Sequence, residues 1–308
     1  MRNKISIIGA GHVGATAALW IMARNLADVV LLDVVEGVPQ GKALDLRQAL
    51  PIAHSGIRVT GTNDYAETAN SDIVLITAGL PVKPGLSRDD LLRTNFKIIS
   101  DVVAKVIAYS PESILIIVSN PLDAMTQAAY RLSGFNRERV LGASGVLDTA
   151  RFCGFIAAEL KVNVEDVRST VLGAHGVAIV PLVRATTVAG VPLSRLLSAE
   201  RIEALIQLTR RGGGEIVKHL RNASAAYAPS AAAVLMAEAI LNDSKQILCC
   251  SAYLEGEYGV DGCCLGVPCR LGAAGLEKIV DLQLAAGESS ALQLSAAAVR
   301  AQCGVIGV

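Results

Sequence analysis

The chain has 308 residues, and its 28 Lys and Arg residues are balanced by 28 Asp and Glu residues, so its formal net charge is zero. A neutral chain lacks the general electrostatic attraction that draws basic proteins to nucleic acids and anionic membranes. Hydrophobic residues make up 52% of the chain and aromatic residues only 4%, which indicates closely packed, alanine-rich helices and buried subunit interfaces. The length allows two domains that share one interface. We expect a protein that binds neither nucleic acid nor membrane.

The amino terminus imitates a signal peptide, because Met1-Arg2-Asn3-Lys4 precedes an uncharged stretch that reaches Ala23. A glycine pattern within that stretch explains the same residues better, so we expect a cytoplasmic protein. The seven cysteines are an odd number, which fits reduced thiols better than a disulfide framework. The pairs 249–250 and 263–264 lack Cys-x-x-Cys spacing, so we expect no metal site.

The first turn of the chain contains Gly-x-Gly-x-x-Gly, at Gly9, Gly11 and Gly14. The pattern lies between a buried strand at residues 5–8 and an apolar helix expected at residues 15–24, which is the context of the dinucleotide-binding fingerprint. There the first glycine makes a tight turn, the second lets backbone approach a pyrophosphate, and the third lets the helix pack on the strand. The amino end of the helix directs its amides and its positive dipole at the phosphates.

An acidic residue completes the fingerprint, because Asp33 follows a second buried strand at residues 29–32. The fingerprint places such an acid about twenty residues after the glycines. A carboxylate there accepts hydrogen bonds from the adenosine ribose hydroxyls and repels a 2′-phosphate, so it selects NAD over NADP. The alternative is that Asp33 is an ordinary residue of a strand-end turn. The strand, glycines, helix and acid in register favour the cofactor.

Strands alternate with helices over residues 1–144. The expected elements after Asp33 are a turn within 36–46 that leads into a helix, strands at 57–60, 72–77, 114–119 and 140–141, a helix at 89–108, and a helix after residues 120–123 that ends near 132. This alternation predicts a doubly wound parallel sheet, that is, a Rossmann domain. Ligands of such sheets bind beyond the carboxyl ends of the strands, so the Pro- and Gly-rich segment 80–88 is a candidate lid.

Residues 145–308 follow another pattern and predict a separate, mixed α+β substrate-binding domain. The expected elements are helices at 147–160, 199–219 and 230–241, strand-like runs at 167–172, 247–253 and 264–270, a hairpin around 189–190, and a final Ala-rich helix.

Six motifs together resemble the lactate/malate dehydrogenase family, in its lactate dehydrogenase-like malate dehydrogenase branch, and the resemblance covers essentially the whole chain. They are residues 9–14 (GAGHVG), 36–42 (EGVPQGK), 77–79 (TAG), 119–123 (SNPLD), 147–152 (LDTARF) and 173–176 (GAHG). The resemblance implies an NAD-dependent oxidoreductase of the tricarboxylic acid cycle. It also implies a small 2-hydroxy or 2-oxo acid as substrate, no metal, and a homodimer or homotetramer.

The resemblance assigns the cofactor-binding residues by position. They are Gly9, Gly11, His12, Val13, Gly14, Asp33, Thr77, Ala78, Gly79, Asn95, Val118 and Asn120. Asn120 matches a residue that contacts the substrate oxygen or the nicotinamide ribose, although an Asn-Pro turn at a strand end is its simpler explanation.

His175 occupies the family's catalytic position, and Asp148 matches the partner carboxylate that fixes the histidine tautomer. Oxidising a 2-hydroxy acid removes a hydroxyl proton while a hydride leaves the same carbon. An imidazole suits that proton transfer, because its pKa lies near working pH. A lone histidine among small apolar residues is more often structural, but the motif favours catalysis here.

Two arginines complete the expected site. Arg151 lies three residues after Asp148, so both project from nearly one face of a helix. An arginine fork pairs with a substrate carboxylate through two parallel hydrogen bonds, and a surface ion pair is the alternative. Arg88 resembles the arginine that closes over the substrate and polarises its carbonyl group, where charge develops in the transition state.

The chain departs from its family at three positions. Val82 stands where malate dehydrogenases of this branch have the arginine that binds the distal carboxylate of the substrate, and Lys83 is its neighbour. Val177 replaces an aspartate beside the catalytic histidine, and Cys153 stands where an arginine is frequent. Losing a charge-assisted pair should cost selectivity on the order of a thousandfold.

Three hypotheses follow from these departures. The first is a malate dehydrogenase, favoured by the whole-chain resemblance. The second is an L-lactate or other aliphatic 2-hydroxy acid dehydrogenase, favoured by Val82. The third is a catalytically silent NAD-binding paralogue. Retention of Arg88, Asn120, Asp148, Arg151 and His175 argues against the third.

Overall fold

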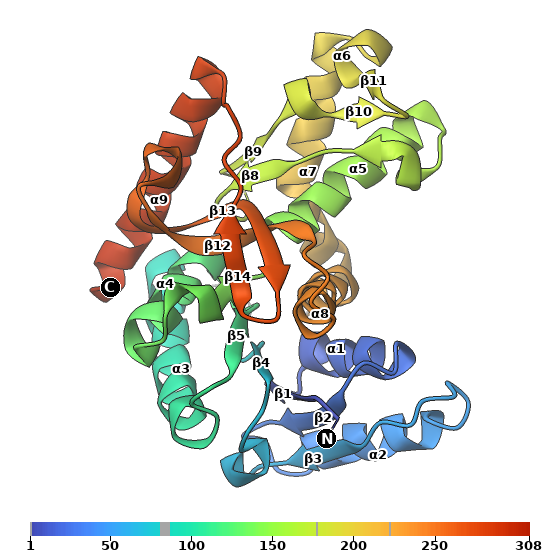
Figure 1. Ribbon diagram of the computed structural model, residues 1–308, viewed down its shortest axis with the longest axis vertical. Coiled ribbons are helices and arrows are strands. Elements are labelled where there is room, and N and C mark those ends of the chain that lie inside the picture. Colours follow the sequence, from blue (N-terminus) through green and yellow to red (C-terminus); the bar gives the residue numbers. More distant parts are fainter. Residues whose placement is uncertain (1, 81–86, 177, 222) are drawn as a thin grey trace.

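The computed structural model describes residues 2–80, 87–176, 178–221 and 223–308 (Figure 1). Nine strands form one sheet, in the order β14-β13-β12-β6-β5-β4-β1-β2-β3. Its members are β1 (Lys4–Ile8), β2 (Asp28–Leu32), β3 (Val59–Thr62), β4 (Ile73–Ile76), β5 (Ile114–Ile117), β6 (Val140–Gly142), β12 (Ile247–Glu255), β13 (Asp261–Gly272) and β14 (Gly275–Ile279). The smaller sheets contain β7 (Val167–Arg168), β8 (Val171–Gly173), β9 (Ile179–Pro181), β10 (Thr187–Val188) and β11 (Val191–Pro192).

Six of the nine strands, β3-β2-β1-β4-β5-β6, run parallel in the order of the Rossmann fold. Every residue of β2, β4, β5 and β6 is buried, which explains why these strands are continuous apolar runs rather than alternating ones. The predicted doubly wound sheet is therefore confirmed. The strand order reverses between β1 and β4, and ligands of open α/β sheets bind at the carboxyl ends of strands at that point.

The helices cover both faces of the sheet. They are α1 (His12–Ala23), α2 (Val38–Ala49), α3 (Arg88–Tyr109), α4 (Leu122–Ser133), α5 (Gly145–Leu160), α6 (Leu193–Leu196), α7 (Ala199–Leu220), α8 (Tyr227–Leu241) and α9 (Ala286–Ile306). Helices α3, α4 and α9 pack on one another, and α1 packs on α8 at the other side (Figure 1). Helix α1 begins earlier than expected, because the N–H of Ala15 already donates to the carbonyl of Gly11 (3.1 Å).

The large sheet continues beyond residue 144, because three strands of the second half extend it. Strand β12 pairs antiparallel with β6, where Ser251 faces Gly142, and β13 and β14 extend the sheet further. A Cβ on Gly142 would lie 2.8 Å from the Cβ of Ser251 and 2.4 Å from Oγ1 of Thr126, so the junction requires glycine. Local periodicity carries no information on a partner strand more than a hundred residues away, so the sequence could not predict this pairing.

The second half differs from expectation in smaller ways too. The predicted strand at 167–172 is two strands, β7 and β8, which belong to different sheets. Strands β9 and β14 were not expected, whereas the hairpin at 189–190 is present between β10 and β11. All seven cysteines are free and buried, which confirms their prediction as reduced thiols. Within the described ranges, no helix has both the length and the apolar character that crossing a membrane requires.

Candidate active site

The three glycines form a cradle between β1 and α1. Gly9 has a φ of +109°, and a Cβ there would lie 2.8 Å from the backbone nitrogen of Ala78. A Cβ on Gly14 would lie 1.9 Å from the carbonyl oxygen of Gly9, so only glycine allows the helix to pack this closely. A Cβ on Gly11 would have no described atom within 4 Å. The cradle is closed where the helix meets the strand and open at Gly11, as backbone approach to a pyrophosphate requires.

His12 and Val13 are the first residues of α1, and the His12 side chain is exposed. Their N–H groups belong to the first turn of the helix, where backbone donors have no acceptor within the helix. The positive end of the helix dipole lies at the same point. This arrangement fits an anion that is bound by backbone groups.

Asp33 directly follows β2, beside the cradle. Its Oδ2 accepts a hydrogen bond from the N–H of Ala10 (2.7 Å), and its Oδ1 accepts one from the N–H of Val35 (3.0 Å). Each carboxylate oxygen has a second lone pair, so Asp33 is fixed in place and still has the capacity to accept hydrogen bonds from ribose hydroxyls. Lys42 adds a third contact to this corner, because its Nζ donates to the carbonyl oxygen of Ala10.

Most of the other predicted cofactor residues lie along the same edge of the sheet. Thr77, Ala78 and Gly79 follow β4, and Val118 and Asn120 follow β5. Thr77 Oγ1 donates to the carbonyl oxygen of Gly9 (2.9 Å), which joins the end of β4 to the cradle. Asn120 is exposed, whereas Val118 is buried.

Asn95 joins two loops of this edge through its side-chain amide. Its side chain is 1% exposed, and its Oδ1 accepts from the N–H of Leu80 (2.7 Å). Its Nδ2 donates to the carbonyl oxygens of Leu80 (3.1 Å) and Asn120 (2.7 Å), which occupies both amide hydrogens. Asn95 therefore ties the loops that follow β4 and β5 together, and its role in cofactor binding remains a prediction.

His175, Asp148 and Arg151 form one hydrogen-bonded group. Asp148 and Arg151 lie one turn apart on α5, and Nη1 of Arg151 donates to Oδ1 of Asp148 (3.3 Å). The other oxygen of Asp148 is 2.8 Å from Nδ1 of His175. Asp148 is 1% exposed, whereas the side chains of Arg151 and His175 are 12% and 18% exposed. The ion pair is therefore mostly buried, and it is not the surface pair that was its alternative.

A second carboxylate holds the main chain of His175. Asp123, in the first turn of α4, accepts the N–H of His175 on Oδ2 (2.8 Å) and the hydroxyl of Ser251 on Oδ1 (2.6 Å). Asp123 is 3% exposed and Ser251 is completely buried. Because α4 follows β5, this bond attaches His175 to the edge of the sheet where the cofactor residues gather. The flanking glycines, Gly173 and Gly176, have φ of +87° and +100°, which few other residues adopt.

Charge and burial act in opposite directions on these groups. Burial disfavours the charged imidazole of His175, but the adjacent carboxylate of Asp148 outweighs it, so the pKa of His175 is raised above its ordinary value. Burial raises the pKa of Asp123, although hydrogen bonds from Ser251 and His175 oppose that change. The site therefore stabilises the imidazolium form of His175 and the neutral form of the Asp123 carboxyl group, each relative to its ordinary balance.

Arg88 is not joined to this group within the part of the chain that the structure describes. Arg88 is the first residue of α3 and is exposed, and among the described residues it has no hydrogen bond or ion pair. Val82 and Val177 lie outside the described residues, as do Lys83 and most of the candidate lid. The roles of Arg88 and Val82 therefore remain predictions.

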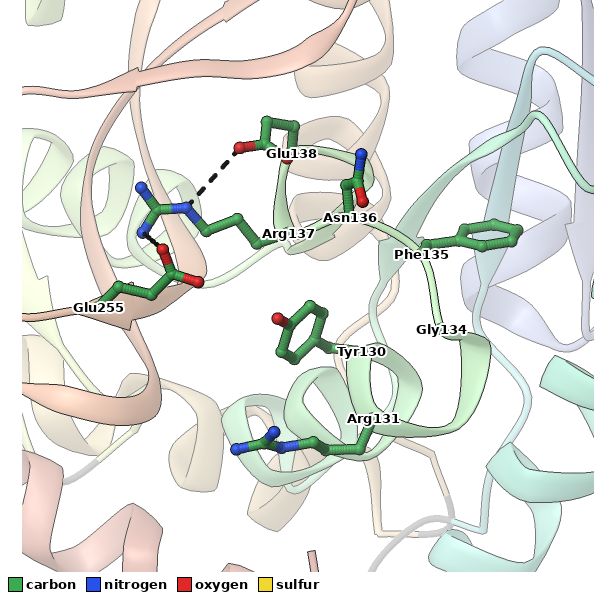
Figure 2. Close-up of a pocket in the computed structure, with 8 residues that line it drawn as sticks. All are labelled: Tyr130, Arg131, Gly134, Phe135, Asn136, Arg137, Glu138 and Glu255. Carbon is green, nitrogen blue, oxygen red and sulfur yellow. Dashed lines mark ion pairs between the residues drawn. The ribbon is translucent and has the colours of Figure 1, made fainter.

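A pocket of about 400 Å³ lies elsewhere, at the carboxyl end of α4 (Figure 2). Tyr130 lines it from α4, and Arg137 pairs there with Glu255 (3.4 Å) and Glu138 (3.7 Å). None of its lining residues is a predicted site residue. Because its charges already neutralise one another and Asp123 lies at the opposite end of α4, this pocket is not the candidate active site.

Sequence reasoning missed Asp123 and Ser251 as parts of the site. Asp123 is the last residue of the SNPLD motif, so a signal for it was present in the chain. Ser251 has no such signal, because its place depends on the pairing of β12 with β6.

Replacing Asp123 tests whether its hydrogen bonds to His175 and Ser251 stabilise the fold. We expect Asp123→Ala to lower the free energy of unfolding by about 1–3 kcal/mol, because it leaves a buried N–H and a buried hydroxyl without their shared acceptor. Asp123→Asn should lose much less, since burial already favours the neutral carboxyl group and the amide has the same shape. Urea denaturation measures both variants. Equal losses for alanine and asparagine would contradict this account.

Comparison with known proteins agrees with this geometry. The model of the lactate/malate dehydrogenase NAD-binding domain matches residues 3–142, and that of the lactate/malate dehydrogenase alpha/beta C-terminal domain matches residues 145–304. A malate dehydrogenase of Roseiflexus castenholzii is 54% identical over 97% of both chains.

Solved structures of the same family have the same fold. The malate dehydrogenase of Salinibacter ruber has a TM-score of 0.94 at 48% identity, covering 99% of this chain and 97% of that one. A lactate dehydrogenase of Cryptosporidium parvum, complexed with lactic acid and NAD, has a TM-score of 0.97 at 41% identity, covering 100% and 98%. The chain belongs to the lactate/malate dehydrogenase family of NAD-dependent oxidoreductases, which act on the CH–OH group of 2-hydroxy acids.

Proposed function

We propose that this protein interconverts malate and oxaloacetate, with His175 as the group that takes up and returns the substrate proton. The observation that supports it most is the 2.8 Å contact between Nδ1 of His175 and the buried carboxylate of Asp148, which also binds Arg151. One carboxylate thus sets the spacing between a base and a cation. The substrate needs that pair, because it has a hydroxyl group to deprotonate and a carboxylate to anchor.

The proton path follows from the tautomer. A neutral His175 that donates its Nδ1–H to Asp148 leaves Nε2 as an acceptor for the hydroxyl proton of the substrate. The imidazolium that forms lies beside the Asp148 carboxylate, which stabilises it. Arg151 would hold the substrate carboxylate through its guanidinium, and Arg88 would polarise the carbonyl oxygen. Bound NAD would supply the hydride acceptor for the carbon that carries the hydroxyl group.

The cofactor would lie along the edge described above. Gly9, Gly11 and Gly14, with the first amides of α1, would hold the pyrophosphate, and Asp33 would bind the adenosine ribose. The residues after β4 and β5, including Asn120, would lie beside the nicotinamide half.

We also propose the wider setting of the protein. It would work as a cytoplasmic homodimer or homotetramer in the tricarboxylic acid cycle, with cofactor binding assigned to residues 1–144 and substrate binding to residues 145–308. Apolar side chains on the surface support an oligomer, among them Leu44 (51% exposed), Ile52 (82%) and Tyr227 (79%).

Removing the base tests the function itself. His175→Ala should reduce turnover of oxaloacetate by roughly 10²–10⁴-fold, the usual contribution of a positioned acid or base, while NADH still binds. NADH oxidation at 340 nm measures turnover, and His219→Ala, an exposed histidine in α7, is the control. If the His175 variant keeps its turnover, His175 is not the group that takes up the substrate proton. If the unaltered protein binds NADH but turns over neither oxaloacetate, pyruvate nor branched 2-oxo acids, it is the silent paralogue.

The raised pKa of His175 predicts a pH dependence. Reduction of the 2-oxo acid needs a protonated His175, so its rate falls as pH rises through that pKa. Asp148→Asn removes the negative charge that raises this pKa, so the alkaline limb of the reduction profile should move to lower pH. Steady-state rates across pH measure the shift. An unchanged limb, or one moved to higher pH, would show that Asp148 does not set the pKa.

Val82 makes a lactate-type acid the second candidate substrate. Such an acid lacks the distal carboxylate, so it needs no arginine at position 82. The test is the ratio of kcat/KM for oxaloacetate to that for pyruvate. Val82→Arg should raise this ratio, by up to a factor on the order of a thousand, because it supplies a charge-assisted partner for the distal carboxylate. Lys83→Ala is the matched control. If arginine leaves the ratio unchanged, the role given to position 82 is wrong, and if Lys83→Ala lowers it sharply, Lys83 already supplies the cation.

A further inference from the structure

Helix α7 contains three successive glycines, Gly212, Gly213 and Gly214. Each glycine in a helix interior costs roughly 1 kcal/mol relative to alanine, so such a run weakens the helix. Two of the three have no structural need for glycine, because a Cβ on Gly213 or Gly214 would meet no described atom within 4 Å. Gly212 is different, because it is buried in the contact between α7 and α5.

Gly212 lies directly against the side chain of Arg151. A Cβ on Gly212 would lie 2.7 Å from Cδ, 3.0 Å from Nε and 3.6 Å from Cζ of Arg151. The three atoms nearest to that position therefore all belong to one arginine. Helices α5 and α7 lie side by side (Figure 1). Gly212, without a Cβ, leaves the space that the stem of Arg151 occupies.

The Arg151 side chain is thus held at two points. Asp148 binds its guanidinium (3.3 Å), and the space at Gly212 accommodates its Cδ and Nε. A methyl group at position 212 is too close for the present rotamer, so the arginine would have to rotate about its side-chain bonds. Rotation of the stem carries the guanidinium away from Asp148, because that group lies at the far end of the same chain.

We propose that Gly212 is a positioning residue for substrate binding: it provides the space that lets Arg151 direct its guanidinium at the carboxylate of the 2-oxo or 2-hydroxy acid. This inference rests on the proposed function, in which Arg151 binds that carboxylate. Gly212 itself touches neither substrate nor cofactor, so its effect is expected in KM for the 2-oxo acid and not in the binding of NADH.

A merely structural glycine would behave differently. Alanine favours a helix over glycine, so replacement at a site without a clash stabilises the folded protein. Gly212→Ala should therefore weaken substrate binding without a comparable loss of stability in α7. Gly213→Ala and Gly214→Ala lie on the same helix and serve as matched controls, because their added methyl groups meet open space.

The experiment measures KM and kcat for oxaloacetate, the Kd for NADH and the Tm of the three alanine variants. Gly212→Ala should raise KM by about tenfold, the loss expected when one hydrogen bond to a charged group is weakened. NADH affinity should stay within twofold, and the two controls should have the KM of the unaltered protein and a Tm at or above its Tm. The inference is overturned if Gly212→Ala has the KM of the controls.

Two further variants separate the possible failures. Arg151→Lys alone should raise KM strongly, and if it does not, the proposed role of Arg151 fails irrespective of Gly212. The double variant Arg151→Ala/Gly212→Ala should have the KM of Arg151→Ala, because no guanidinium remains to be displaced. If Gly212→Ala does not fold, the same double variant should restore NADH binding. If it stays unfolded, the clash is not with Arg151, and the inference is wrong.

Discussion

The carboxylate of Asp148 is the contact on which the rest of the site depends. It is 1% exposed, and its two oxygens bind Nδ1 of His175 and the guanidinium of Arg151. A buried carboxylate without partners is costly, so the contacts with His175 and Arg151 stabilise the Asp148 carboxylate. In return, the carboxylate fixes the positions of these two side chains. In the proposed function, this one side chain consequently sets both the geometry of proton transfer and the geometry of substrate anchoring. Gly212 belongs to the same arrangement, because it leaves room for the arginine to reach that carboxylate.

The site also depends on how the two halves of the chain share one sheet. Strand β12 joins the parallel sheet through β6, which brings Ser251 onto Asp123 at the start of α4. Asp123 then binds the N–H of His175. His175 comes from a loop within residues 145–308. Through Asp123 it is nevertheless attached to the carboxyl edge of the parallel strands, where the glycine cradle and Asp33 lie. The assembly of the site is therefore part of the packing of the sheet, and no flexible linker separates base from cofactor edge among the described residues.

The parallel half of the fold was predictable from the sequence, because buried strands and amphipathic helices have distinct local periods and the glycines mark the first turn. The contacts of Asp148 with Arg151 and His175 followed from helical spacing and from motifs. The sequence did not predict the antiparallel extension of the sheet, the hydrogen bond of Asp123 to His175, or the contact of Gly212 with Arg151. Each of these depends on residues that are distant in sequence. Asn95 shows the same limit: its hydrogen bonds to Leu80 and Asn120 join two loops whose approach the sequence does not reveal.

Nitrogen-15 NMR of the His175 ring tests the central claim most directly, since the chain has only four histidines and His175→Ala identifies the signal. The account predicts a neutral ring protonated at Nδ1, with Nε2 free to accept a proton, and a pKa above the ordinary value for histidine. A neutral ring protonated at Nε2, or a pKa at or below the ordinary value, would contradict it.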